Sequence, residues 1–341
     1  MRDWRVVVLL SIGVCLFTWS GVAVAQGSWA VEKTFHIGGD GGMDYITVDE
    51  KNHLLYVPRS THTMVVDAES GKVVGGIPGQ KHNHGVALVP SAGRGFITDG
   101  EGAVVIFDLK TNAVLGTLKA HPDADGIIYD EASGLVLVVS GDDGVLMTVK
   151  PDVDPKTGSM DADIPLGGKP EFLAADGAGK AYINLEDKDQ IAVVDLKARK
   201  VLAHWSVAPG GSPVGMAMDP KKRRLFIGCR KPQKMIVMNA DDGKVLADLP
   251  IGAGVDATKF DGSQAFASCR DGHLSVVGEN MGKFEIQQTV TTALGAKTMD
   301  VDAGAHKAYL PTFEFEEQKP GATGRPQAKP GTFMIVVLGR H

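Results

Sequence analysis

Short apolar runs separated by polar turns fill most of this chain, and their arrangement returns about every forty residues. In the first copy, the runs cover residues 44–49, 54–58, 64–67 and 71–77. Alternating and β-branched residues dominate them, which predicts strands, and the spacing of amphipathic helices is absent. Successive copies start 40–46 residues apart, and four short strands in that length are the period of a propeller blade.

The number of copies predicts a closed ring of seven blades. Aligning them places one residue of each copy at an equivalent position: Asp44, His84, Asp125, Glu171, Val214, Asp256 and Lys297. The last copy ends after its third strand, residues 333–338, and residues 31–37 resemble the missing fourth strand. Pairing these two segments would close the ring and cover its edges. We therefore expect an all-β, seven-bladed β-propeller whose last blade is completed by the N-terminal strand.

The second to fourth strands of the first copy read LLYVPRSTHTMVVDAESGKVVGGIPG. This stretch resembles the YVTN-type repeat, in which Tyr-Val-Thr-Asn is followed by Val-Asp and then Gly-Lys-Val-Val. On these residues the chain resembles the YVTN/YncE-like β-propeller repeat family over nearly all of its length after residue 25. Pro58-Arg59 replaces Thr-Asn here, and the copy at residues 121–168 has a long turn. The resemblance implies a propeller and export, but no particular activity, because propellers host enzymes, binders and scaffolds.

The first 25 residues have the layout of a secretory signal peptide. Two arginines precede or flank an apolar stretch at residues 6–17, and the small-residue site Ala-Val-Ala follows at 23–25. An uncleaved membrane anchor is the alternative, but the stretch is shorter than the ~20 residues that a spanning helix needs. We expect cleavage after Ala25, a periplasmic or secreted protein without a membrane anchor, and one domain over residues 26–341.

Charge and composition narrow the possible partners. The net charge is −6, so there is no basic excess to attract nucleic acid. The basic run at residues 221–224 lies in a predicted hairpin and is expected to be a solvated turn. The 43 glycines and 17 prolines suit the many tight turns of an all-β protein. We expect a monomer that binds a small ligand or a partner protein.

One face of the predicted ring collects most of the side chains that suit a binding site. In a propeller, the loops that enter the innermost strands and the turns after the second strands surround the mouth of the central channel, the usual place for a ligand. The ligand-binding candidates there are Asp44, Arg59, His62, His84, His121, Asp125, Glu171, Arg230, Asp256 and Arg270. A ring of carboxylates suits a cation. The arginines suit either an anionic ligand or ion pairs between blades.

A divalent metal ion is the candidate cofactor. His82 and His84 would point to the same side of an extended segment. Imidazoles and carboxylates are ligands for transition metals. The candidate ligands are His82, His84, His121 and Asp123. A structural cation or channel water remains the alternative, because no spacing here is as diagnostic as paired CxxC motifs.

Two other features leave alternatives open. Cys229 and Cys269 occupy equivalent positions in neighbouring copies. They predict either a disulfide, which needs alpha carbons within about 7 Å, or two free thiols in small buried sites. The last copy contains a Pro/Gly-rich insertion at residues 313–331. Its length is typical of a functional flap, with Phe313 and Phe315 over the channel mouth, or of a disordered loop.

The function expected from the sequence is that of an exported binding or scaffold propeller that presents its His/Asp-rich mouth to a small ligand, metal ion or partner protein. The repeat is complete, but no catalytic motif such as a serine nucleophile elbow or HExxH is present. The alternative is a metal-dependent enzyme, lactonase-like or lyase-like, with His84 or His121 as general base. A third possibility is a redox accessory protein, although the chain has no CxxCH haem site.

Overall fold

The computed structural model describes residues 27–317, 324 and 326–341. The signal peptide expected at residues 1–25 and part of the 313–331 insertion therefore lie outside the described residues. Over the described ranges, no helix is long and apolar enough to cross a membrane.

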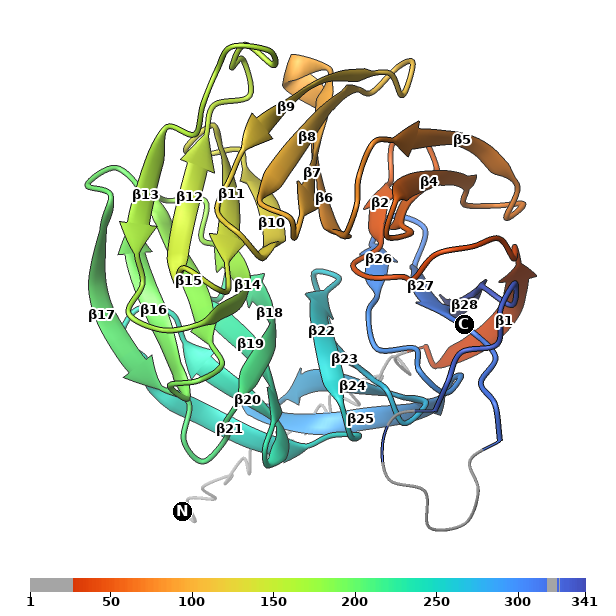
Figure 1. Cartoon of the computed structure of the whole chain (residues 1–341). Coiled ribbons are helices and arrows are strands. Elements are labelled where there is room, and N and C mark those ends of the chain that lie inside the picture. Colours follow the sequence, from red (N-terminus) through yellow and green to blue (C-terminus); the bar gives the residue numbers. More distant parts are fainter. Residues whose placement is uncertain (1–26, 318–323, 325) are drawn as a thin grey trace, which may run out of the picture.

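Seven four-stranded antiparallel sheets stand side by side around a central channel (Figure 1). This arrangement confirms the seven-bladed β-propeller. The innermost strands, in blade order, are β2 (Thr47–Asp49), β6 (Asn83–Val89), β10 (Ala124–Asp130), β14 (Pro170–Ala175), β18 (Pro213–Asp219), β22 (Val255–Phe260) and β26 (Asp300–Asp302). The second strands are β3 (Leu54–Pro58), β7 (Arg94–Asp99), β11 (Leu135–Ser140), β15 (Lys180–Leu185), β19 (Arg224–Arg230), β23 (Ala265–Cys269) and β27 (Lys307–Thr312).

The outer half of each blade consists of a third and a fourth strand. The third strands are β4 (His62–Asp67), β8 (Ala103–Asp108), β12 (Val145–Val149), β16 (Gln190–Asp195), β20 (Gln233–Asn239), β24 (His273–Asn280) and β28 (Met334–Arg340). The fourth strands are β5 (Val73–Pro78), β9 (Val114–Lys119), β13 (Ala162–Pro165), β17 (Lys200–Ser206), β21 (Val245–Pro250), β25 (Lys283–Thr291) and β1 (Trp29–His36). A short 3₁₀ helix, η1 (Pro90–Ala92), joins β6 to β7.

The hydrophobic core lies between the blades, and strand alternation explains how one strand serves two parts of it. In β11, Val136 and Val138 pack against residues of blade two, whereas Leu137 and Val139 pack against residues of blade four. All four side chains are fully buried. Because successive side chains of a strand point to opposite faces, a continuous apolar run is what a blade between two neighbours requires.

The turns on the face opposite the channel mouth are held by a repeated aspartate. In six blades it follows or ends the innermost strand: Asp49, Asp130, Asp176, Asp219, Asp261 and Asp302. Asp176 Oδ1, for example, accepts hydrogen bonds from the backbone N–H groups of Ala178 (2.8 Å) and Lys180 (2.9 Å). Such Asx-type bonds fix a tight turn without help from neighbouring strands. In blade two, Val89 and η1 replace the aspartate turn.

The basic run at residues 221–224, expected to be a solvated turn, joins blades through ion pairs. Arg223 contacts Asp176 (2.9 Å) of the preceding blade and Asp241 (2.8 Å) of its own blade. Lys222 contacts Glu279 (2.8 Å) of the following blade. These ion pairs lie on the face opposite the channel mouth, where they connect blades four, five and six.

The N-terminal strand closes the ring, as the sequence predicts. β1 pairs with β28 from Trp29↔Arg340 to His36↔Met334 and so supplies the outer strand of blade seven. Trp29 is 1% exposed, lies edge-on to Phe266 of blade six (ring centroids 5.0 Å apart), and donates from Nε1 to Gln264 Oε1 (2.9 Å). One side chain therefore attaches the closing strand to the neighbouring blade.

Replacing Trp29 by alanine removes this attachment. We expect Trp29→Ala to lower the free energy of unfolding by about 3–5 kcal/mol, because a large buried aromatic side chain is lost and a cavity remains. Urea titration followed by circular dichroism measures the change. Val31→Ala is the matched control on the same strand, because Val31 is 41% exposed and should cost less than about 0.5 kcal/mol. Equal losses in the two variants would contradict the proposed role of Trp29.

Candidate functional site

Backbone bulges place the equivalent residues of the repeat at the channel mouth. Between Asn83 and Val86, three steps of β6 oppose only two steps of β7, whose partners there are Asp99 and Ile97. The same irregularity occurs near the start of β10, β14, β18 and β22. A bulge redirects the side chains at the extra residue. The bulged segments contain His84, Asp125, Glu171, Val214 and Asp256.

Blades one to three bring one imidazole between two carboxylates. His84 Nδ1 lies 2.8 Å from Asp44 Oδ2 and 3.7 Å from Asp125 Oδ1. All three side chains are less than one-fifth exposed. One ligand atom from each residue lies within 4.8 Å of the other two. Asp125 Oδ1 is buried and has no hydrogen-bond partner among the described residues.

On the other side of the mouth, bases from blades five and seven neutralise neighbouring carboxylates. Lys297 contacts Asp256 and lies 3.6 Å from Asp44 Oδ1, so it joins the two halves of the mouth. Arg230 contacts Asp256 and lies 3.1 Å from Glu186 Oε1. Although burial opposes ionisation, Lys297 and Arg230 lower the pKa of Asp256. Arg270 acts in the same direction on this pKa.

The acidic half of the mouth retains protons more strongly than ordinary side chains do. Burial disfavours a charged His84, but the hydrogen bond to Asp44 and the charge of Asp125 outweigh this and raise the pKa of His84 to about 9. Burial raises the pKa of Asp125 to about 7, against the attraction of His84. Proton affinity of this kind shows that positive charge between these carboxylates lowers the free energy of the site.

Glu171 and Glu186 form a second proton-sharing pair beside the first. Burial, followed by the hydrogen bond to Glu186, raises the pKa of Glu171 to about 9. That hydrogen bond and the charge of Arg230 lower the pKa of Glu186. At neutral pH, Glu171 is therefore a protonated carboxylic acid that donates to the Glu186 carboxylate.

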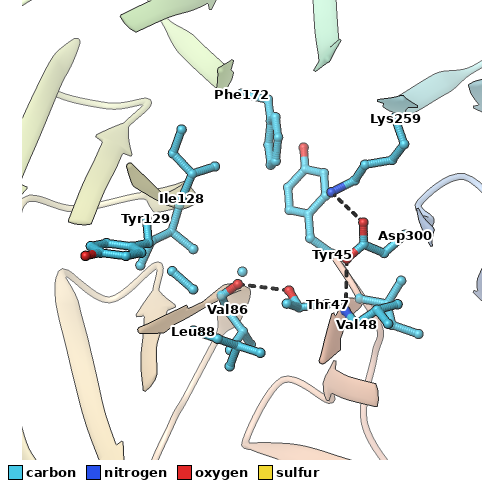
Figure 2. Close-up of a pocket in the computed structure, with 14 residues that line it drawn as sticks. Tyr45, Thr47, Val48, Val86, Leu88, Ile128, Tyr129, Phe172, Lys259 and Asp300 are labelled. Atoms are coloured by element: carbon cyan, nitrogen blue, oxygen red, sulfur yellow. Dashed lines mark hydrogen bonds and ion pairs between the residues drawn. The ribbon is translucent and has the colours of Figure 1, made fainter. Parts of the chain in front are cut away.

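An aromatic pair forms the floor of the mouth. Tyr45 and Phe172, each next to a mouth residue in sequence, approach from opposite blades with ring centroids 4.8 Å apart. Figure 2 shows them across the channel, with Lys259 reaching Asp300 (3.0 Å) beside them. The inner strands here line a cavity of about 290 Å³. Burial raises the pKa of the Tyr45 hydroxyl, and the negative charges of nearby carboxylates, with Asp125 first among them, raise it further.

Arg59, one of the predicted ligand-binding residues, is bound by the loop that enters blade one. It is fully buried and donates to the carbonyl groups of Gly38, Gly39, Gly41 and Gly42 over 2.8–3.2 Å. Its guanidinium carbon lies 3.9 Å from the centroid of the Phe333 ring. The side chain therefore holds the loop that enters blade one. Burial of the imidazole, followed by the charge of Arg59, lowers the pKa of His62 at the start of β4.

His121 contacts two other carboxylates instead of those in the cluster of Asp44, His84 and Asp125. Its Nδ1 lies 2.5 Å from Asp143 and its Nε2 lies 3.0 Å from Asp163, so carboxylates of blade three engage both ring nitrogens. The predicted set of His82, His84, His121 and Asp123 is thus only partly assembled. His82 and His84 do meet, with ring centroids 4.6 Å apart, while Asp123 lies 3.9 Å from Lys169.

The two cysteines are not joined by a disulfide, and Phe313 of the insertion packs into the core. Cys229 and Cys269 are buried free thiols, and burial raises the pKa of each to about 12. Phe313 packs on Phe333 with ring centroids 5.5 Å apart, so it belongs to the core beside blade one rather than to a cover over the channel. Phe315 pairs with Ala328 through an isolated bridge.

Comparison with known proteins identifies no family. No protein-family model matches the sequence, and a search of curated proteins finds no matching relative. The site must therefore be interpreted from its own geometry.

Sequence reasoning missed three residues of this site. Lys297 occupies the equivalent position of blade seven, but a single lysine does not suit the cation site that the carboxylates predict. Glu186 follows the second strand of blade four, where the mouth turns were expected, and a systematic list of charged residues in those turns would have included it. Tyr45 carries no signal in the sequence, because only the cross-channel contact with Phe172 shows its position.

The pKa of Glu171 predicts how stability depends on pH. The folded protein holds this proton up to about pH 9, whereas the unfolded chain releases it near the ordinary glutamate value, so the stability that the proton contributes is lost as pH rises toward 9. We expect Glu171→Gln, which stays neutral and can still donate to Glu186, to reduce the loss of unfolding free energy between pH 6 and pH 9 by about 1 kcal/mol or more. Urea titrations at both pH values measure it.

Glu186→Gln is the control for this effect. It removes the carboxylate that pairs with Arg230, and so it should destabilise the protein at both pH values. An unchanged pH dependence in Glu171→Gln would show that Glu171 does not hold a proton in the folded protein.

Proposed function

We propose that this protein is an exported, YVTN-type binding propeller that holds a divalent cation at Asp44, His84 and Asp125 and presents it at the channel mouth to a small ligand or partner protein. The observation that carries the proposal is the convergence of two carboxylates and one imidazole within 4.8 Å of one another. The proposals of export and of YVTN-type membership rest on the N-terminal and repeat sequences described above.

The distribution of charge supports a cation in this half of the mouth. Asp256 has Arg230 and Lys297 as partners, and Glu186 has Arg230. Within the described part of the chain, Asp125 has only His84 within ion-pair distance. A divalent ion would replace the imidazolium proton and also satisfy the orphaned Asp125 oxygen. Two carboxylates and one imidazole suit manganese, zinc or iron, with open positions left for water or ligand.

The Glu171–Glu186 pair favours a metal-dependent enzyme as the second candidate function. A protonated carboxylic acid beside a metal-bound substrate is suited to protonate a leaving group. In this version Glu171, rather than His121, provides acid–base chemistry, because both nitrogens of His121 are already engaged. Hydrolysis of simple lactones by the metal-loaded protein, lost in Glu171→Gln with metal binding intact, would favour the enzyme over the binding protein.

Cation binding can be measured directly with Mn²⁺ by isothermal titration calorimetry on chelator-free, untagged protein. We expect about one ion per chain, and at least a tenfold loss of affinity in Asp125→Asn, because a direct ligand is removed. The ion must displace a proton that His84, whose pKa is raised to about 9, holds at neutral pH. Affinity should therefore increase between pH 6 and pH 8.

Asp143→Asn is the matched control, because Asp143 also contacts a histidine but lies outside the cluster. It should bind Mn²⁺ as the wild type does. Equal losses in the two variants, or no stoichiometric uptake of Mn²⁺, Zn²⁺ or Fe²⁺ by the wild type, would refute the proposed cation site.

A further inference from the structure

His84 has a second ring nitrogen, and its surroundings differ from those of the first. While Nδ1 faces Asp44 and Asp125, Nε2 is buried, and no residue that the structure describes forms a hydrogen bond with it. A bare nitrogen in that position is costly unless water or an ion occupies the adjacent space. The neighbour on this side is the ring of His82, which meets His84 at 66° with centroids 4.6 Å apart.

Gly100 leaves open the space that these two rings share. A β-carbon on Gly100 would lie 2.9 Å from His84 Nε2 and 3.1 Å from His82 Nδ1. Both nitrogens therefore face one small volume above this glycine. The Gly100 carbonyl accepts a hydrogen bond from the backbone N–H of Asp123 (2.8 Å), which helps to hold this turn in place.

The backbone holds His82 in this position. The Asp99 carboxylate accepts hydrogen bonds from the N–H groups of Lys81 (2.7 Å) and His82 (3.3 Å). The N–H of Gly100 in turn donates to the carbonyl of His82 (2.8 Å). The loop that carries His82 is thus attached to the turn that carries Gly100, so the two backbone segments beside this space are fixed relative to each other.

We propose that His82 Nδ1 and His84 Nε2, above Gly100, form a binding site for a late first-row transition metal, with Cu²⁺ bound most tightly. Paired imidazoles prefer copper, nickel and zinc, and copper binds most strongly in this series. A histidine that binds metal through one nitrogen commonly donates the other N–H to a carboxylate, which orients the ring and strengthens the ligand. The 2.8 Å contact from His84 Nδ1 to Asp44 supplies this second bond.

This site goes beyond the proposed cation between Asp44 and Asp125 and uses the opposite nitrogen of His84. The two positions require opposite tautomers of His84, so they exclude each other in one molecule. Carboxylate-preferring ions such as Mn²⁺ should occupy the first position, and Cu²⁺ the second. Different ions and different variants therefore report on the two sites separately.

Gly100→Ala tests the site without removing a ligand. Gly100 is not among the glycines with a positive φ angle, so alanine suits its backbone, and the new methyl group would fill the space between the nitrogens. With Cu²⁺ as the probe in isothermal titration calorimetry, we expect about one ion in the wild type and at least a tenfold loss of affinity in both Gly100→Ala and His82→Ala. Electron paramagnetic resonance of the bound Cu²⁺ should show coupling to imidazole nitrogens.

Two controls separate this proposal from the previous one. Asp125→Asn should lose Mn²⁺ but retain Cu²⁺, and His62→Ala, which removes another histidine near the mouth, should retain both. Thermal unfolding by circular dichroism establishes that each variant is folded. Wild-type copper affinity in Gly100→Ala, or copper without nitrogen coupling, would overturn the imidazole site and leave the Mn²⁺ result unaffected.

Discussion

The convergence of the innermost strands on one channel is the constraint on which the rest of the mouth depends. Six blades bring an ionisable residue at the equivalent position to this entrance, so charges from distant parts of the sequence must share a small, partly dry space. Like charges there repel strongly because little water screens them. Every carboxylate at the mouth must therefore be compensated by a basic side chain, a bound proton or a metal cation.

The two halves of the mouth meet this requirement differently. In blades five to seven, Arg230 and Lys297 stand beside Asp256, and the pKa of that carboxyl falls. In blades one to four, carboxylates outnumber bases, and protons make up part of the difference: the pKa values of His84, Asp125 and Glu171 all rise. Groups that retain protons because of nearby carboxylates are also groups that a metal ion can deprotonate and bind. The asymmetry thus points to blades one to three as the cation-binding side.

The repeat made the fold predictable from sequence, including the closure of the last blade by residues near the N-terminus. It also located the equivalent position that reaches the mouth, because every copy carries the same strand spacing. The sequence could not show which neighbours pair with one another, since this depends on distances between blades. Arg59 shows the limit: its charge and position resemble those of a ligand-binding residue, yet the carbonyl groups of the preceding glycine-rich loop bury it. Gly100 shows the reverse. Nothing in the sequence marks this glycine as part of a site, yet the absence of a side chain leaves space between His82 and His84.

The contacts around the mouth also indicate how a ligand would reach it. Tyr45 and Phe172 meet across the channel, and His84 lies near the start of β6, so the face where the inner strands begin is the nearer entrance to His84. The loops on that face are fixed, by Arg59 in blade one and by Asp99 in blade two. Fixed loops at an entrance favour recognition by a preformed arrangement of charges over one that assembles around its ligand. At the two cation sites proposed above, the choice between metal ions rests on His84, because each of its nitrogens has different neighbours.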